Sequence, residues 1–185
     1  MHHGGLLKIQ NVPWKGTYWV EPGYFLAGNF PGDMQVLKTR ERIGMLLDAG
    51  IRCFINLMSQ DEIGEGHGKL PCYHSILSEL AAERKISFSY NQFPIGDFNT
   101  PSKNLMGQII DLLKKSIKEK QPVYLHCWAG RGRTGLVVGC YLKHCRNLSS
   151  EEAIKALQGL REAANAPGVS PETPSQFQFI AYWEP

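Results

Sequence analysis

Short apolar runs alternate with longer amphipathic stretches along this chain, and the alternation predicts strands and helices in turn. The turn signal Glu21-Pro22-Gly23 separates the first two apolar runs, which we therefore expect to form a hairpin. Runs rich in β-branched and aromatic residues predict strands over residues 18–20, 25–27, 51–57, 86–93 and 123–125. Apolar positions at helical spacing predict helices over residues 33–49, 73–84, 100–119, 133–142, 149–163 and 174–183.

Three of these helices carry start signals in the sequence. Asp33 is a candidate N-cap for the first helix. Thr100 is a candidate N-cap for the third, with Pro101 at the first helical position, where a missing N–H removes no helical hydrogen bond. Ser149 and Glu152 have the spacing of a capping box. We expect the three helices to begin at these residues.

The order of the predicted elements indicates an α/β fold. Strands that alternate with helices favour a mainly parallel central sheet flanked by helices on both faces. The chain has 185 residues, enough for one domain and too few for two ordinary ones. We expect a single domain over residues 1–185, with residues 1–15 as a peripheral N-terminal extension. In such a sheet, ligands bind beyond the carboxyl ends of the strands.

Composition narrows the classes of partner. A formal net charge of +3 is too small to indicate nucleic-acid binding, but it suits an anionic substrate. We find no apolar run long enough to span a membrane and no signal peptide, so we expect a cytoplasmic protein. The five cysteines are an odd number without zinc-ligand spacing, which also fits a reducing cytosol. We expect a monomer.

The stretch from Pro122 to Gly135, P-V-Y-L-H-C-W-A-G-R-G-R-T-G, carries the chemistry. An apolar strand ends at Cys127, and a helix begins near Arg133. The small residues between them let successive backbone N–H groups converge on one point, beside the positive end of the helix. A dianionic phosphate fits such a cradle, and the planar guanidinium of Arg133 can bind two of its oxygens. We call residues 127–133 the phosphate loop.

A cysteine beneath this cradle is a candidate nucleophile. Thiols beside cations or at helix N-termini have a depressed pKa, roughly 3.5–7.5, so we expect Cys127 to react as a thiolate. The hydroxyl of Thr134 can donate to that sulfur, and His126 can hydrogen-bond the loop backbone. The alternative is a buried structural cysteine beside a glycine turn. The spacing of His-Cys, five residues and Arg-Thr-Gly argues against that alternative.

Residues 126–135 resemble the signature of cysteine-dependent protein tyrosine phosphatases, more closely that of the dual-specificity-like branch with its small bacterial members. Residues 20–31 also resemble the opening segment of small members of that branch. The resemblance implies hydrolysis of phosphomonoesters through a phosphocysteine intermediate, with no cofactor and no metal. It also implies a phosphate site made by the loop residues Trp128, Ala129, Gly130, Arg131, Gly132 and Arg133.

Displacement of an alkoxide or phenoxide from phosphorus needs a proton donor, and Asp97 is the candidate. It follows a predicted strand directly and lies 30 residues before Cys127. The segment from Phe93 to Asp97 resembles the general-acid loop of dual-specificity-like phosphatases. The alternative is an ordinary turn aspartate, in which case the acid must be sought among Asp61, Glu62 and Glu65.

Further residues have two readings each. Gln176 matches a glutamine in the glutamine-bearing segment of tyrosine phosphatases, or it serves only the start of a helix; a second expected glutamine falls at Glu172. Arg131 binds a second phosphate or an acidic flank, or it faces solvent. Trp128 stacks on substrate or packs on the sheet edge. His67 and the carboxylates of the loop over residues 59–71 lack metal-ligand spacing, so we expect a solvated loop.

The sequence leaves the substrate open. The leading hypothesis is a protein-tyrosine or dual-specificity phosphatase acting on phosphoproteins. The same chemistry on an inositol phosphate, a phosphoinositide or another polyanionic small molecule is prompted by Arg131. RNA 5′-triphosphatase activity is a weaker option, because no basic-aromatic surface is evident. An inactive phospho-binding module is a hypothesis of another class, opposed by the joint presence of Cys127, Arg133 and Asp97.

Overall fold

The computed structural model describes residues 12–59, 62 and 72–184. The described residues form the strands β1 (Tyr18–Glu21), β2 (Phe25–Gly28), β3 (Cys53–Asn56), β4 (Ser89–Gln92) and β5 (Val123–His126). They also form the helices α1 (Val36–Asp48), α2 (Tyr73–Glu83), α3 (Lys103–Lys118), α4 (Gly132–Cys145), α5 (Ser150–Ala163) and α6 (Pro174–Tyr182). Each described element lies within or close to a segment that the sequence predicts.

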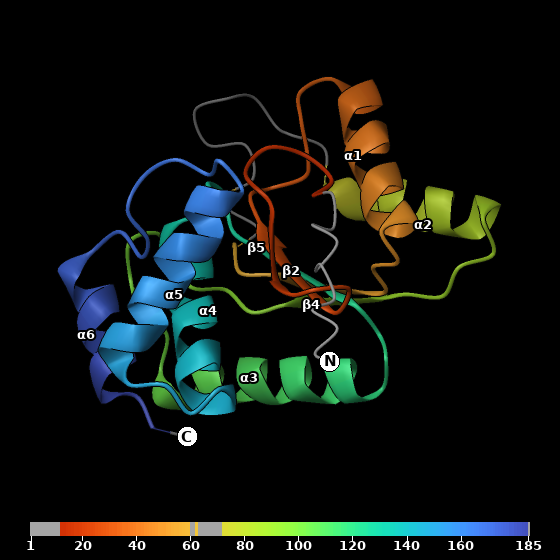
Figure 1. The fold of residues 1–185 in the computed structure, drawn as a ribbon. Coiled ribbons are helices and arrows are strands. Elements are labelled where there is room, and N and C mark those ends of the chain that lie inside the picture. The colour runs from red at the N-terminus through yellow and green to blue at the C-terminus, as the bar shows by residue number, and fades with distance from the viewer. Residues whose placement is uncertain (1–11, 60–61, 63–71, 185) are drawn as a thin grey trace, which may run out of the picture.

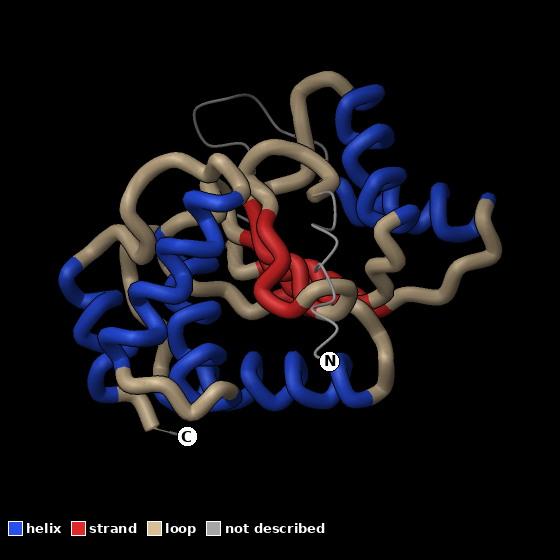
Figure 2. Tube along the Cα trace, in the orientation of Figure 1, coloured by secondary structure: helices blue, strands red, loops and turns tan. Residues whose placement is uncertain are grey.

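The strands form one sheet in the order β1-β2-β5-β3-β4. β1 pairs antiparallel with β2 as the expected hairpin, and the other pairs are parallel. Helices α1 and α2 lie on one side of the sheet, and α3 to α6 lie on the other (Figure 1). Figure 2 shows the strands enclosed between these helices and the connecting loops. The predicted α/β architecture with a mainly parallel sheet is confirmed.

The phosphate loop joins two deeply buried elements. β5 is the central strand and is buried along its whole length, since helices cover both faces of the sheet. α4 is buried from Gly132 to Leu142, as its all-round apolar sequence predicts, and it packs against α3, α5 and α6. A Cβ on Gly139 would lie 2.4 Å from Ile180 Cδ1, so the glycine permits the close approach of α6. The loop therefore has a rigid support on both sides.

Two predicted helix starts are wrong. α1 begins at Val36, after an N-cap at Gln35 that makes no side-chain cap bond. The Asp33 carboxylate instead accepts from the Gln35 N–H, in a turn that precedes the helix. α3 begins at Lys103, because the hydroxyl of Ser102 accepts from the Leu105 N–H and takes the capping role that we expected of Thr100.

Other boundaries follow the sequence closely. The capping box of Ser149 and Glu152 is present at the start of α5, as predicted. The predicted candidates Asp61, Glu65 and His67, and most of the proposed N-terminal extension, lie outside the described residues. In the part of the chain that the structure describes, no helix is both long and apolar enough to cross a bilayer.

Candidate active site

The phosphate loop lies at the carboxyl end of β5, where the register brings Gly28, Asn56 and His126 level with one another. Gly130 has a φ of +68°, and a Cβ there would lie 2.5 Å from the carbonyl carbon of Gly28. The loop thus packs against the end of β2 in a backbone conformation that favours glycine. The Phe30 N–H also donates to the Trp128 carbonyl at 2.9 Å.

Cys127 occupies the floor of this loop and is 2% exposed. The hydroxyl of Thr134 lies 3.1 Å from Cys127 Sγ and 3.4 Å from the carbonyl oxygen of Gly28. Because sulfur has the larger radius, the shorter contact is the closer hydrogen bond, and the hydroxyl is best placed to donate to Sγ. This is the geometry that the sequence predicts for Thr134.

His126 connects the loop to α2. Its Nδ1 lies 3.2 Å from the Cys127 carbonyl oxygen, which can only accept, so Nδ1 carries the proton. Nε2 then accepts from the Tyr73 hydroxyl at 2.7 Å. The pKa of His126 is lowered to about 3, mainly by burial; the hydrogen bond to the Cys127 carbonyl raises it, and the charge of nearby Arg133 lowers it. His126 is therefore a neutral support for the loop, as expected.

Arg133 is the second residue of α4 and is 1% exposed, and its charge is paired. Nη1 donates to both oxygens of Glu62, at 2.8 and 2.6 Å, and to the Ile95 carbonyl at 3.0 Å. Nη2 lies 3.0 Å from Asp97 Oδ1. Either edge of a guanidinium that can bind two oxygens includes Nη2, so a phosphate bound at two points shares this nitrogen with Asp97.

Asp97 reaches this centre from the loop after β4, and its side chain is half-exposed. The start of α6 holds that loop in place. The Thr173 hydroxyl donates to the Phe98 carbonyl at 3.3 Å, and Gln176 Nε2 donates to the Asn99 carbonyl at 3.2 Å. The structure therefore brings the predicted nucleophile, cation and acid to one edge of the sheet.

Gln176 is fully buried and is part of the capping box of α6. Its Oε1 accepts from the backbone N–H groups of Glu172 and Thr173, at 3.0 and 3.3 Å. The helix-start reading of Gln176 matches these contacts. The bond to the acid loop adds a role that neither reading anticipates.

Residues that sequence reasoning missed support the loop from behind. Arg161 is buried, and its Nη1 donates to the Gly130 carbonyl at 2.6 Å. The Ser170 hydroxyl donates to the Arg131 carbonyl at 2.8 Å. Arg161 follows Leu157 by four residues and so lies on the apolar face of α5. A charged residue at such a position could have indicated a buried role. Glu62 was named only as an alternative acid, and its pairing with Arg133 was not predicted, because its loop reads as an ordinary polar surface.

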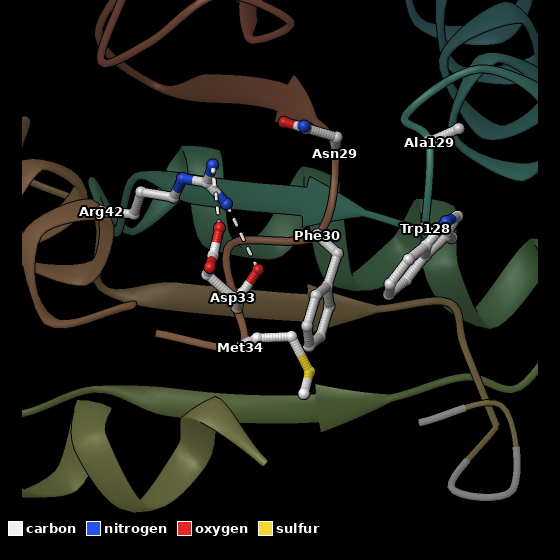
Figure 3. Close-up of a pocket in the computed structure, with 8 residues that line it drawn as sticks. Asn29, Phe30, Asp33, Met34, Arg42, Trp128 and Ala129 are labelled. Atoms are coloured by element: carbon white, nitrogen blue, oxygen red, sulfur yellow. Dashed lines mark hydrogen bonds and ion pairs between the residues drawn. The ribbon is translucent and has the colours of Figure 1, made fainter. Parts of the chain in front are cut away.

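A cavity of about 370 Å³ opens beside the phosphate loop (Figure 3). The ring of Trp128 stacks on Phe30, with centroids 5.6 Å apart, and Met34 lies against the same opening. Arg42 lines another part of the cavity, 3.7 Å from the carboxylate of Asp33. Trp128 is 39% exposed, so its position allows both packing on Phe30 and contact with a bound molecule.

Arg131 is not simply a solvent-facing arginine, because it forms an ion pair. Its Nη2 lies 2.7 Å from Glu172 Oε1, and so the second cation of the phosphate loop has a carboxylate partner. All five cysteines are free thiols. Among the residues that the structure describes, no group of three or more His, Cys, Asp or Glu side chains is arranged to hold a metal ion.

A comparison with known protein families finds one whose profile covers most of the residues of this site. A family profile described as "Polymorphic toxin system, DSP-PTPase phosphatase" matches residues 31–146, which include Asp97 and the whole phosphate loop. PTEN1 of Arabidopsis thaliana, a phosphatidylinositol 3,4,5-trisphosphate 3-phosphatase and protein-tyrosine-phosphatase, is 35% identical over 94 residues, 50% of this chain and 22% of that protein. Protein tyrosine phosphatase domain-containing protein 1 of Mus musculus is 30% identical over 144 residues, 76% of this chain and 19% of that protein. The chain thus spans about a fifth of the length of these relatives.

Solved structures share the fold. A kinase associated phosphatase whose catalytic-site cysteine is replaced by serine superposes with a TM-score of 0.72 and 18% identity, over 92% of this chain and 93% of the other. PTPMT1 in complex with PI(5)P gives a TM-score of 0.67 and 21% identity, over 90% and 93% of the two chains. Identities this low establish the common fold and leave the substrate undecided.

Proposed function

This chain belongs to the DSP-PTPase phosphatases, the dual-specificity-like branch of the cysteine-dependent protein tyrosine phosphatases, and we propose that it hydrolyses phosphomonoesters through a phosphocysteine intermediate. One observation carries the proposal. Asp97 lies 3.0 Å from Arg133, which follows Cys127 across the phosphate loop, so a nucleophile, a phosphate-binding cation and an acid meet at one edge of the sheet.

In the first step, the Cys127 thiolate attacks phosphorus while the bond from phosphorus to the leaving oxygen breaks. The backbone N–H groups of the phosphate loop and the guanidinium of Arg133 stabilise the charge on the non-bridging oxygens. Asp97, in its protonated form, gives its proton to the leaving oxygen, so the product departs as a neutral alcohol or phenol. The phosphoryl group is then bonded to sulfur.

In the second step, water attacks phosphorus and the phosphorus–sulfur bond breaks. The Asp97 carboxylate takes a proton from that water, which returns the acid to its starting state. Sulfur leaves as a thiolate, and the hydroxyl of Thr134, 3.1 Å from Sγ, stabilises the charge that develops on it. Inorganic phosphate is released and the cycle is complete without an external reductant or oxidant.

The ion pair between Arg133 and Asp97 couples binding to acid catalysis. Nη1 of Arg133 is held by Glu62 and the Ile95 carbonyl, so Nη2 is the donor that a phosphate gripped at two points must recruit. A phosphate bound at Nη2 therefore lies next to Asp97, the residue that gives its proton to the leaving oxygen in the first step.

The cavity beside the loop supports a phosphoprotein substrate. Its walls include the rings of Phe30 and Trp128, and a cavity of about 370 Å³ next to the cradle suits a peptide side chain that flanks a phosphorylated residue (Figure 3). The alternative substrate is a phosphoinositide or another polyanionic small molecule. The names of PTEN1 and of the PTPMT1 complex with PI(5)P are what support that alternative.

We also propose a cytoplasmic, monomeric enzyme that needs no cofactor. A catalytic thiolate requires a reducing compartment, and the five free cysteines are compatible with one. The proposed catalytic residues all come from one chain, so the chemistry requires no second copy.

Replacement of Cys127 tests the proposal. Cys127→Ser should abolish hydrolysis of an aryl phosphate but retain binding of inorganic phosphate, because the cradle and Arg133 remain. Cys72→Ser is the matched control, since Cys72 is an exposed free thiol at the start of α2. The proposal fails if the Cys127 variant keeps near wild-type activity while the control is equally active.

A further inference from the structure

Arg131 is the second of two cations in the phosphate loop, and a carboxylate holds it. Its Nη2 lies 2.7 Å from Glu172 Oε1, with the arginine side chain 39% exposed and the glutamate side chain 17% exposed. The guanidinium also lies close to Gly168, where a Cβ would be 3.0 Å from Arg131 Cζ. The charge of Arg131 is therefore held on the segment that leads into α6.

Glu172 is a fixed part of the rim of the phosphate loop. Its backbone N–H donates to the buried Gln176 amide oxygen at 3.0 Å. Its Oε2 sits so close to the loop that a Cβ on Gly132 would lie 2.7 Å away. The Ser170 hydroxyl, from the same segment, donates to the Arg131 carbonyl. The segment before α6 therefore contacts both the backbone of Arg131, through Ser170, and its side chain, through Glu172.

This arrangement has an electrostatic consequence for the substrate. A phosphate monoester carries about −1.5 to −2 charges near pH 7. In the proposed mechanism, Arg133 binds the phosphoryl group that is cleaved. Arg131 is the other cationic residue of the phosphate loop. A second phosphoryl group near Arg131 meets the fixed carboxylate of Glu172, which repels it and already occupies Nη2.

We infer that the pair of Glu172 and Arg131 is a charge filter that selects substrates with a single phosphate, such as a phosphorylated side chain of a protein. The filter disfavours compounds with a second phosphate next to the reacting one. This inference rests on the proposed function and chooses between its two substrate classes. Glu172 lies beyond residues 31–146, the part that matches the family profile.

Binding of inorganic phosphate and pyrophosphate measures the filter directly. Titration calorimetry in the Cys127→Ser background gives a dissociation constant for each anion, and the ratio of the two constants is the readout. Glu172→Gln keeps the size and removes the charge, so it should improve pyrophosphate binding relative to phosphate by about tenfold. Adding Arg131→Gln should return the ratio to near its starting value. Glu151→Gln, at the exposed start of α5, makes the same change in net charge and should leave the ratio unchanged.

Two results overturn the inference. In one, Glu172→Gln leaves the ratio within twofold of its parent. In the other, Glu172→Gln weakens pyrophosphate relative to phosphate, which means that Glu172 orients Arg131 toward a second phosphate. If Glu172→Gln does not fold, the doubly substituted protein Glu172→Gln/Arg131→Gln decides between the two roles. The filter predicts that its ratio of dissociation constants is unchanged. The orienting role predicts that it loses affinity for pyrophosphate. These measurements need no turnover, so failure of the filter is distinguishable from failure of the proposed hydrolysis.

Discussion

We assign two tasks to Asp97, and a single substitution separates them. Its carboxylate lies 3.0 Å from Arg133 Nη2, where its charge opposes the binding of a phosphate. In the proposed mechanism, its acid form protonates the leaving group. A residue with both tasks slows catalysis when it is removed, yet strengthens the binding of a phosphate that no longer competes with it.

Asp97→Asn tests both tasks. The variant should lose about 10²–10⁴-fold in kcat/KM on phosphoserine, whose alkoxide leaves poorly without a proton. On an activated aryl phosphate, whose leaving group is stable as an anion, the loss should be far smaller. Inhibition by inorganic phosphate should become about two- to fivefold stronger, the size of a partly exposed ion pair.

The control is Asp111→Asn, an exposed aspartate on α3, which should change none of these quantities. Breakdown of the phosphocysteine does not enter kcat/KM, which contains only the steps up to phosphorylation of Cys127. It does enter kcat, so burst kinetics must show which step limits kcat. Wild-type rates on both substrates together with unchanged inhibition by phosphate would make Asp97 a turn residue only.

At the scale of elements, the loop between β5 and α4 depends on one backbone conformation. Gly130→Ala places a Cβ at a φ of +68° and 2.5 Å from the Gly28 carbonyl carbon. We expect the free energy of unfolding to fall by at least about 1–3 kcal/mol and activity to be lost, since the strain falls on the cradle itself. Urea unfolding and aryl phosphate hydrolysis measure the two effects.

Gly159→Ala is the matched control. Gly159 lies in α5 with open space where its Cβ would be, so the alanine should stabilise the protein by about 0.5–1 kcal/mol. Equal effects of the two substitutions, or an active Gly130 variant of wild-type stability, would contradict the strained-loop account.

The elements themselves were predictable because each is marked by a continuous apolar run or by apolar positions at regular spacing. The all-round apolar run of α4 and the short runs of the strands fix their type and order. The start of α3 was misplaced because two capping residues stand close together. Thr100 and Ser102 are both good caps, and the choice between them depends on which hydroxyl meets the N–H three residues later.

The site was predictable where its residues are adjacent in sequence. Cys127, Arg133 and Thr134 share one loop, whose glycine spacing already specifies a cradle. Glu62, Arg161 and Glu172 come from distant segments, and long-range pairing of charges leaves no local pattern. Their contacts with the loop appear only when the sheet brings the segments together.

At the scale of the whole molecule, the buried His126 makes stability depend on pH. Its pKa is lowered to about 3 in the folded protein, from about 6.5 in the unfolded chain. Between these values the unfolded chain binds a proton that the folded protein does not, so stability is present above pH 6.5 and is lost as the pH falls. The contribution of His126 should fall by about 2 kcal/mol between pH 7 and pH 5.

His126→Gln isolates this contribution. The variant should be less stable at pH 7, because it loses the link between Tyr73 and the Cys127 carbonyl. Its free energy of unfolding should nevertheless fall less steeply on acidification, by the same 2 kcal/mol or so. Parallel pH profiles for the two proteins would show that His126 titrates normally in the folded state.

The central claim is that the phosphoryl group passes through the sulfur of Cys127. Its most direct test is rapid denaturation during turnover of an activated aryl phosphate, followed by mass spectrometry to locate the phosphoryl group. The Asp97→Asn variant should accumulate the intermediate, because the second step lacks its base. The account predicts phosphorylation of Cys127 and of none of the other four cysteines. Continued turnover with Cys127 unmodified in both wild type and variant, or a phosphoryl group on another residue, would contradict it.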